Sequence, residues 1–284
     1  MERVANTDIP LALKAAAYVA LGFFTLFTLF TLFPLGWLGY TSLKPEHEIV
    51  QSIIAWPHDW TFENYVQAWQ LGEFSHLFLN SILYSVVTTI VVVLLSLSAA
   101  FAFTKIPSRF TPIWYVFILM GLLVTISSAI VPIFVAENFL GIVNTRIGII
   151  IPYIAFNISF AIYLAAAFIR SISDEIIEAS KIDGAGYMRI YWSIVLPMSR
   201  PIITTIAIFT FQACWIEYVL VYMLSSDDSI RTVQVGLSLL HGQLSFNFGF
   251  LFAAIVIAQA PLFILYIFFR RQLQAGFSMG SVKG

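Results

Sequence analysis

The sequence of 284 residues is 60% hydrophobic and only 10% charged, and its formal net charge is −1. Because soluble domains average about 25% charged residues, this composition excludes an ordinary soluble protein and indicates a membrane protein with several spans. The near-neutral charge gives no support to nucleic-acid binding. The single cysteine, Cys214, excludes an internal disulfide and a cysteine-based zinc site.

The chain opens with a short polar segment, residues 1–14, which we expect to be cytoplasmic. Residues 15–39 are predicted to form the first transmembrane helix. This apolar stretch is longer than the core of a signal peptide and no clear cleavage site follows it, so we interpret it as an uncleaved anchor. Residues 40–76 are polar and are expected to be extracytoplasmic, with an interfacial helix that begins near Asp59.

Five further apolar runs follow, at about residues 77–103, 113–135, 147–168, 202–224 and 246–269. Each is long enough for the roughly 20 residues that cross a bilayer, and only helices leave no unpaired backbone in lipid. The predicted fold class is therefore an all-α integral membrane protein with six transmembrane helices. Residues 77–269 form one five-helix transmembrane domain in this prediction, and residues 270–284 form a C-terminal tail. We expect kinks at the prolines inside the runs, Pro132, Pro152 and Pro261.

Basic residues set the expected orientation. With the N-terminus inside, the cytoplasmic segments hold eleven of the 14 Lys and Arg residues. Cytoplasmic loops of membrane proteins carry such an excess, so both termini are predicted to be cytoplasmic.

The longest polar interruption in the apolar second half is residues 178–197, EASKIDGAGYMRIYWSIVLP. Just before it, Ser173 is expected to cap a short helix through its side-chain oxygen. Asp174 and Glu175 fall in the first turn, where the helix dipole favours negative charge.

Glycine and proline are expected to end the two helices of this segment. Gly184 can take the left-handed conformation that terminates a helix. A second short helix is predicted from Tyr187 to Val195, with Pro197 stopping it. The result is a helix–turn–helix bracket, which the charge bias places in the cytoplasm.

This bracket resembles the cytoplasmic EAA loop of type I ABC importer permeases, which reads Glu-Ala-Ala, then Asp-Gly-Ala, then Ile-x-Leu-Pro. The matching residues are Glu178, Ala179, Asp183, Gly184, Ala185, Ile194, Leu196 and Pro197. Ser180 replaces the second alanine, a small-for-small change. In that family the loop, residues 170–201 here, docks into a cleft on a separate ATPase subunit. The resemblance therefore implies ATPase coupling through Glu178, Ala179, Ser180, Asp183, Gly184, Ala185, Leu196 and Pro197.

Three other segments are similar to sugar-type permeases: residues 42–49 (SLKPEHEI), 60–65 (WTFENY) and the terminal GFSMGSVKG. The resemblance implies a bacterial inner-membrane permease that forms half of the path for a sugar or oligosaccharide. It also implies three kinds of partner: a second permease, usually a different chain, an ATPase dimer that binds ATP and Mg, and an extracytoplasmic solute-binding protein. The tail beside Arg270 and Arg271 is a further candidate contact with the ATPase.

One acid, Glu217, lies within the fifth apolar run. A charge at the centre of a span costs roughly 2.5–3.5 kcal/mol on insertion scales, so this side chain must face the bundle interior or a wet path. Trp215 and Glu217 match a Trp-Asn-Glu pattern of carbohydrate permeases, with Ile216 in place of Asn. The candidate path residues are Tyr153, Asn157, Gln212, Trp215, Glu217 and Tyr218. Helix–helix hydrogen bonding is the favoured alternative for most of them.

The sequence contains no pattern that predicts a catalytic, nucleotide-binding or metal site within this chain. There is no phosphate-binding Gly-x-x-x-x-Gly-Lys-Ser/Thr loop, so we expect no ATP site, no catalytic residue and no cofactor in this chain. The histidines form no His-Glu-x-x-His pair, and no metal site is expected. Three alternatives stay open: a permease of the same fold for polyamines or phosphate, a stand-alone secondary carrier, and a membrane enzyme. One intramembrane acid and no visible repeat argue against the carrier, and the lack of paired catalytic groups argues against the enzyme.

Overall fold

The computed structural model describes residues 11–243 and 247–281, and the elements in these ranges are all helical. The first ten residues and the last three, part of the predicted terminal segments, lie outside the described residues. Four described helices are long and apolar enough to cross a membrane, and the number rises to six if each of two bent helix pairs is one span. The chain divides into two compact units, residues 1–68 with 245–257 and residues 69–244 with 258–284, which are described separately.

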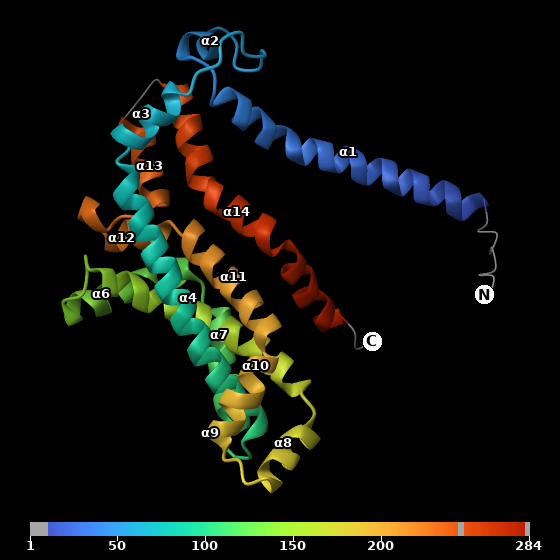
Figure 1. Ribbon diagram of the computed structural model, residues 1–284. Coiled ribbons are helices and arrows are strands. Elements are labelled where there is room, and N and C mark those ends of the chain that lie inside the picture. Colours follow the sequence, from blue (N-terminus) through green and yellow to red (C-terminus); the bar gives the residue numbers. More distant parts are fainter. Residues whose placement is uncertain (1–10, 244–246, 282–284) are drawn as a thin grey trace. The chain divides into compact units, whose positions relative to one another are not determined.

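The first unit holds α1 (Leu11–Thr41) and α2 (Glu46–Gln51) and begins α3 (Glu63–Leu71) and α14 (Phe248–Ser281) (Figure 1). Helix α1 contains the first predicted span and begins four residues earlier than expected.

Polar side chains organise the connection after α1. Lys44 is buried and its Nζ donates to the carbonyl oxygens of Ser52 and Ala55, both at 2.8 Å. The Glu48 carboxylate accepts the backbone N–H groups of His58 and Asp59, at 3.0 and 2.9 Å. These backbone donors hold the pKa of Glu48 below its ordinary value. The sugar-permease-like SLKPEHEI segment therefore contributes the side chains that shape its own loop.

The second unit is built around α4 (Phe74–Lys105), which packs against α7 (Arg146–Arg170) and α11 (Arg200–Ile216). Small residues let the helices approach closely, because Ala100 of α4 and Ala161 and Ala165 of α7 are all buried in one cluster. The remaining elements of this unit are α5 (Thr111–Leu119), η1 (Met120–Leu123), α6 (Ile126–Leu140), α8 (Asp174–Ile182), α9 (Tyr187–Ile190), η2 (Tyr191–Val195), α10 (Leu196–Met198), α12 (Val219–Leu224), η3 (Asp228–Ile230) and α13 (Val233–Gln243).

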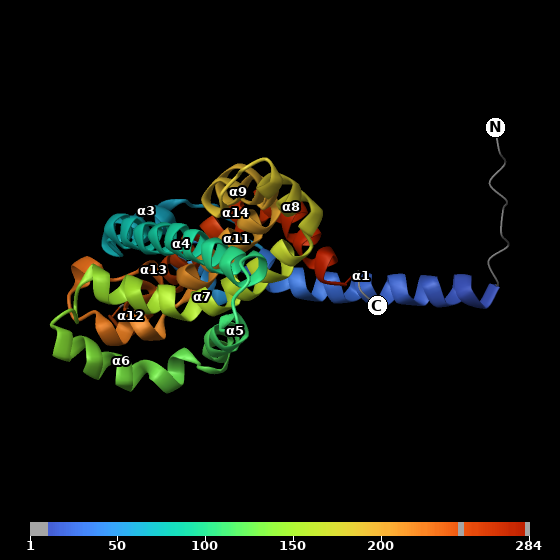
Figure 2. The same cartoon turned by 90° about the horizontal axis from the view of Figure 1, so that it is seen from below.

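The third predicted span is not a straight helix. Helices α5 and α6 meet at 103°, and the sharp angle between them is visible in Figure 2. The break falls at Val124 and Thr125 after the η1 turn, whereas Pro132 lies inside α6, which stays continuous. The break in this span therefore lies before Pro132, the residue at which a kink was expected. Pro152 and Pro261 also lie inside continuous helices.

The fifth predicted span, 202–224, is interrupted. Helix α11 ends at Ile216, and Glu217 has an extended backbone before α12 begins at Val219. At the other end of the chain, α14 continues to Ser281, so the first part of the predicted tail is helical. The physical reason is local: Arg270 to Ala275 are strong helix formers, and no proline follows them.

Candidate functional site: the coupling bracket

The first arm of the bracket, α8, begins as the sequence predicts. The Ser173 side-chain oxygen accepts a hydrogen bond from the backbone N–H of Glu175 at 3.2 Å, which confirms the predicted cap. Asp174 and Glu175 occupy the first turn, near the positive end of the helix dipole, and Lys181 lies in the last turn.

The turn after α8 is built by Gly184, which has φ +82°. The backbone N–H of Gly184 donates to the carbonyl of Lys181 at 3.0 Å, and that of Ala185 donates to Ser180 at 2.9 Å. This pair of bonds is the Schellman motif, in which a left-handed residue closes the end of a helix. The predicted conformation of Gly184 is confirmed.

The second arm is longer than predicted and differs in kind. Helix α9 passes at Tyr191 into a π-helical turn, in which the N–H of Leu196 bonds to the carbonyl five residues back, that of Tyr191. The helix then continues to Met198, so Pro197 does not stop it where we expected. A proline has no N–H to donate, and a wider turn just before it avoids the need for an ordinary bond at that position.

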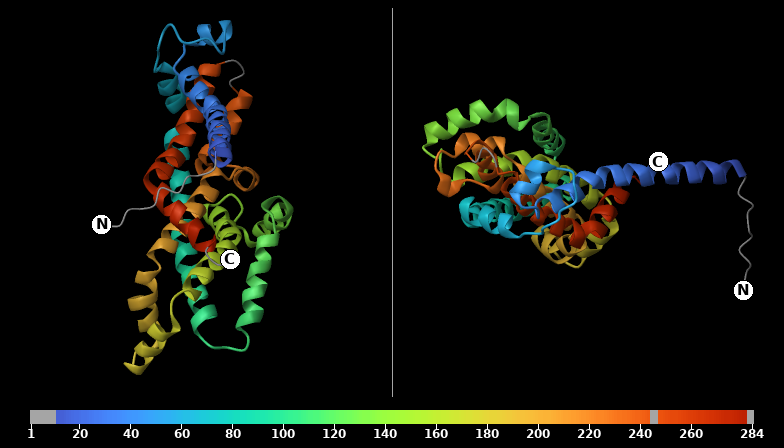
Figure 3. Two further views of the ribbon diagram at one scale, coloured as in Figure 1. Left: turned by 90° about the vertical axis from the view of Figure 1, so that its right-hand side faces the viewer. Right: turned by 90° about the horizontal axis from the view of Figure 1, so that it is seen from above.

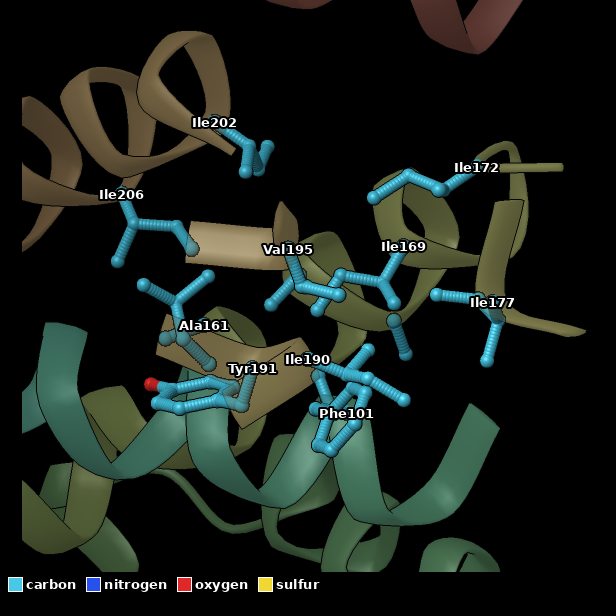
Figure 4. Packing of buried hydrophobic residues seen from close by; sticks show 14 of the residues in the cluster. Phe101, Ala161, Ile169, Ile172, Ile177, Ile190, Tyr191, Val195, Ile202 and Ile206 are labelled. Atoms are coloured by element: carbon cyan, nitrogen blue, oxygen red, sulfur yellow. The ribbon is translucent and has the colours of Figure 1, made fainter. Parts of the chain in front are cut away.

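Apolar packing fixes the bracket to the helix bundle. Ile177 of α8 is only 3% exposed and lies in one hydrophobic cluster with residues of three neighbouring helices and one connection (Figure 4). These are Ile169 of α7, Ile172 of the α7–α8 connection, Ile190 of α9 and Phe101 of α4. The bracket is therefore a packed part of the second unit, and its two arms form one end of this unit (Figure 3).

A buried lysine adds a polar anchor. The Nζ of Lys105, at the end of α4, donates to the carbonyl oxygen of Ile172 at 2.7 Å and to Oδ1 of Asp174 at 2.6 Å. The side chain of Lys105 is 4% exposed, whereas that of Asp174 is 79% exposed. The Lys105 ammonium holds the pKa of Asp174 below its ordinary value. One cation thus joins the end of α4 to the start of α8.

The eight residues for which the resemblance implies ATPase coupling divide into two groups. Glu178, Ala179, Asp183, Gly184 and Pro197 are exposed. The other three are half-buried: Ala185 and Leu196 pack against the core cluster, and the Ser180 hydroxyl donates to the carbonyl of Ile176 at 2.7 Å.

Two apolar side chains stand beside the exposed residues. Ile182 is 86% exposed and Met188 is 71% exposed. The bracket consequently presents an open face of acidic, small and apolar residues on a rigidly packed base.

The structure brings two of the candidate path residues together. The Tyr153 hydroxyl lies 3.4 Å from Oε2 of Glu217. The same carboxylate accepts the N–H of Leu220 at 2.8 Å and of Val221 at 3.3 Å. Glu217 therefore caps the first turn of α12, a structural task that accounts for an acid at the break in this span.

The other path candidates do not converge on one site. Trp215 is buried and its indole N–H donates to the carbonyl of Ala258 at 3.0 Å, and the Asn157 amide donates to the carbonyl of Tyr153 at 2.8 Å. These two contacts agree with the alternative of helix–helix hydrogen bonding.

The last two candidates lie in different surroundings. The Tyr218 hydroxyl is 3.2 Å from that of Ser238. Gln212 is exposed and lines a cavity of about 240 Å³ together with Gln259 and Tyr266 of α14.

Sequence reasoning missed Lys105 and Gln259 as site residues. Lys105 stood at the end of an apolar run and was counted only as a basic residue for orientation. Its burial depends on the approach of the α7–α8 connection, which no local pattern reveals.

A group of possible metal ligands lies in the first unit. The ligand atoms of His47, Glu48 and Asp59 fall within 4.8 Å of one another, although no metal site was expected. Both oxygens of Glu48 already accept backbone N–H groups, so loop closure explains the proximity.

The second unit is all-helical in its described residues and carries a packed bracket between the apolar helices α7 and α11. Residues 71–278 match the family described as the binding-protein-dependent transport system inner membrane component. The chain belongs to this family of inner-membrane transport components.

The chain is also similar to permeases that are named for sugar uptake. The chain is 32% identical over 249 residues to the diacetylchitobiose uptake system permease protein NgcG of Streptomyces coelicolor, covering 87% of this chain and 82% of that protein. It is 30% identical over 253 residues to the trehalose transport system permease protein SugB of Mycobacterium tuberculosis, covering 87% and 91%.

The fold has a solved counterpart in a bacterial ABC transporter involved in the import of the acidic polysaccharide alginate. The TM-score is 0.79 at 22% identity, with 95% of this chain and 99% of that chain covered. A second match, at TM-score 0.67 and 16% identity, comes from a bacterial alginate ABC transporter in complex with an alginate pentasaccharide-bound periplasmic protein. The all-α permease fold predicted from the sequence is confirmed.

Proposed function

We propose that this chain forms half of the translocation path of an ATP-driven importer for a sugar or oligosaccharide. The observation that supports this proposal most is the packed bracket at residues 173–198 in a chain whose relatives are named for the uptake of diacetylchitobiose and trehalose.

In this proposal the bracket is cytoplasmic and its open face docks on a separate ATPase subunit, which binds ATP and Mg. A second permease, expected to be a different chain, completes the path, and an extracytoplasmic binding protein delivers the sugar. Both termini lie in the cytoplasm.

Coupling requires that the bracket contact the two nucleotide states of the ATPase differently. Equal contacts in both states would not shift the equilibrium between the conformations of the permease. The rigid base supports this requirement. Ile177 and Lys105 tie the bracket to α7 and α4, so a displacement of the open face moves these helices with it.

Reconstitution into liposomes tests the proposal. We expect sugar uptake only when the second permease, the ATPase, ATP and the loaded binding protein are all present. Uptake by the lone chain down a solute or ion gradient would contradict the proposal and favour a secondary carrier.

The identity of the solute is tested on the binding protein that co-purifies with the complex. Binding of an oligosaccharide in a ligand screen supports the proposal. Binding of a polyamine or phosphate instead would leave the permease fold in place and replace the substrate class.

A further inference from the structure

A cavity of about 410 Å³ lies in a groove between α6 and α7. Its walls are almost entirely apolar, with residues such as Ile133 and Leu140 on α6 and Ile151 and Phe156 on α7. One acid, Glu137, is the exception.

The Glu137 side chain is buried, with a residue exposure of 4%, and lines this groove. Neither of its carboxylate oxygens has a hydrogen-bond partner among the described residues. A buried carboxylate without a donor is strongly unfavourable, and in a membrane-spanning region such an acid marks a binding site.

The carboxylate lies beside the amino end of α7. Oε2 of Glu137 lies 2.9 Å from the point where a Cβ on Gly148 would be, so the carboxylate rests against the first turn of α7. The amino end of a helix favours negative charge. A glycine at residue 148 leaves the space that this approach needs.

The groove is polar at one end and apolar along the rest. Glu137 lies next to the turn at Gly141, where the chain leaves the apolar α6, while Gly121 and Val124 line the other end. From Gly148 to Phe156 the α7 wall extends about 12 Å at 1.5 Å per residue. An occupant must therefore bring a cationic hydrogen-bond donor at one end and hydrocarbon along its length.

We propose that this groove binds a phospholipid with an ethanolamine headgroup, whose ammonium donates hydrogen bonds to Glu137 and whose acyl chain lies along α6 and α7. An ammonium–carboxylate pair is a strong, charge-assisted interaction. A choline headgroup is cationic but has no N–H to donate, and a glycerol headgroup carries no positive charge. The site therefore selects among lipids by headgroup. This inference does not depend on the transported solute.

Lipid retention tests the site. The full chain is purified in mild detergent with the subunits that accompany it, and bound lipids are measured by native mass spectrometry. We expect about one ethanolamine lipid per chain to be retained in preference to phosphatidylglycerol and phosphatidylcholine. Glu137→Gln is expected to lower that retention about fivefold or more, because the charge-assisted bonds are lost.

Two further variants keep the result interpretable. Ala155→Phe fills the groove and leaves the carboxylate in place, so it should also expel the lipid. Asp59→Asn removes an exposed acid elsewhere and should change nothing.

Three results would each overturn the inference. The first is equal retention of the three lipids by the wild-type protein, and the second is unchanged retention in both groove variants. The third is a photo-crosslinker at Leu140 that labels the second permease and not lipid, which would show that protein fills the groove.

Discussion

Replacing Lys105 by methionine tests whether the bracket acts through its attachment to α4. Methionine keeps the length and apolar character of the lysine stem and removes only the ammonium group. The carbonyl oxygen of Ile172 and the carboxylate of Asp174 then lose the donor that lies 2.7 and 2.6 Å away.

The magnitude follows from the burial of the two acceptors. Asp174 is 79% exposed, so water replaces its lost partner and the ion pair itself contributes little. The carbonyl of Ile172 belongs to a residue that is 5% exposed, and leaving a buried acceptor unpaired costs about 1–3 kcal/mol. At 1.4 kcal/mol per factor of ten, the displaced bracket becomes about 5–150 times more populated.

The assay compares ATP-driven uptake with ATP hydrolysis in proteoliposomes that contain the complete transporter. We expect Lys105→Met to lower the solute transported per ATP at least fivefold, with the complex still assembled, and Lys105→Arg to restore most of it. The matched control is Arg109→Met, because Arg109 is an exposed basic residue near the same end of α4. This variant should behave as wild type. Unchanged transport per ATP in Lys105→Met would refute the reasoning. Loss of assembly in both Met and Arg variants would show that Lys105 serves folding alone.

Three further predictions concern the turn, the helix break and pH. Gly184→Ala should weaken coupling by about 1 kcal/mol, because φ +82° strains an alanine even though no atom lies within 4 Å of the added Cβ. Gly184→Pro should abolish solute-stimulated ATP turnover, because it also removes the N–H that bonds to the carbonyl of Lys181. Wild-type turnover in the proline variant would contradict this role. Glu217→Ala removes the cap of α12 and should destabilise the purified complex by about 0.5–2 kcal/mol in thermal melts. Glu217→Gln should destabilise the complex less. Equal melting temperatures of the wild type and the two variants would count against the cap. Because the folded-state pKa of Asp174 is lowered, its pairing with Lys105 is fully present above about pH 3.9, its unfolded value, and is lost as pH falls through the folded value. The ratio of wild-type to Asp174→Asn uptake should therefore be constant from about pH 5 to 8, and a step within that range would show that the pair titrates there.

Features with a local cause were predicted well. Ser173 and Gly184 define the ends of α8 through capping and left-handed geometry, which depend on a few neighbouring residues. The first, second, fourth and sixth spans were also predicted, because an apolar run of about 20 residues has the length and composition that a membrane-crossing helix requires.

Features set by distant contacts were not predicted. The break at Val124–Thr125 and the π-turn at Tyr191–Val195 lie in apolar sequence that would also suit a straight helix. The role of Glu217 depended on the interruption of the fifth predicted span between α11 and α12, which hydropathy alone does not show.

The same limit applied to the polar anchors. The burial of Lys105 results from the return of the chain at Ile172, 67 residues later. Glu137 lies just beyond the end of a predicted span, and its burial beside Gly148 of α7 depends on a contact that no local pattern shows.

The most direct test of the central claim uses a single cysteine at the open face of the bracket. Ile182 is 86% exposed, whereas the native Cys214 is 3% exposed, so Ile182→Cys provides a reactive site distinct from the native thiol. In the assembled transporter we predict crosslinking of this cysteine to the ATPase subunit, with a yield that changes between the ATP-bound and nucleotide-free states. Labelling of the same cysteine by a membrane-impermeant reagent added outside intact cells would contradict the account.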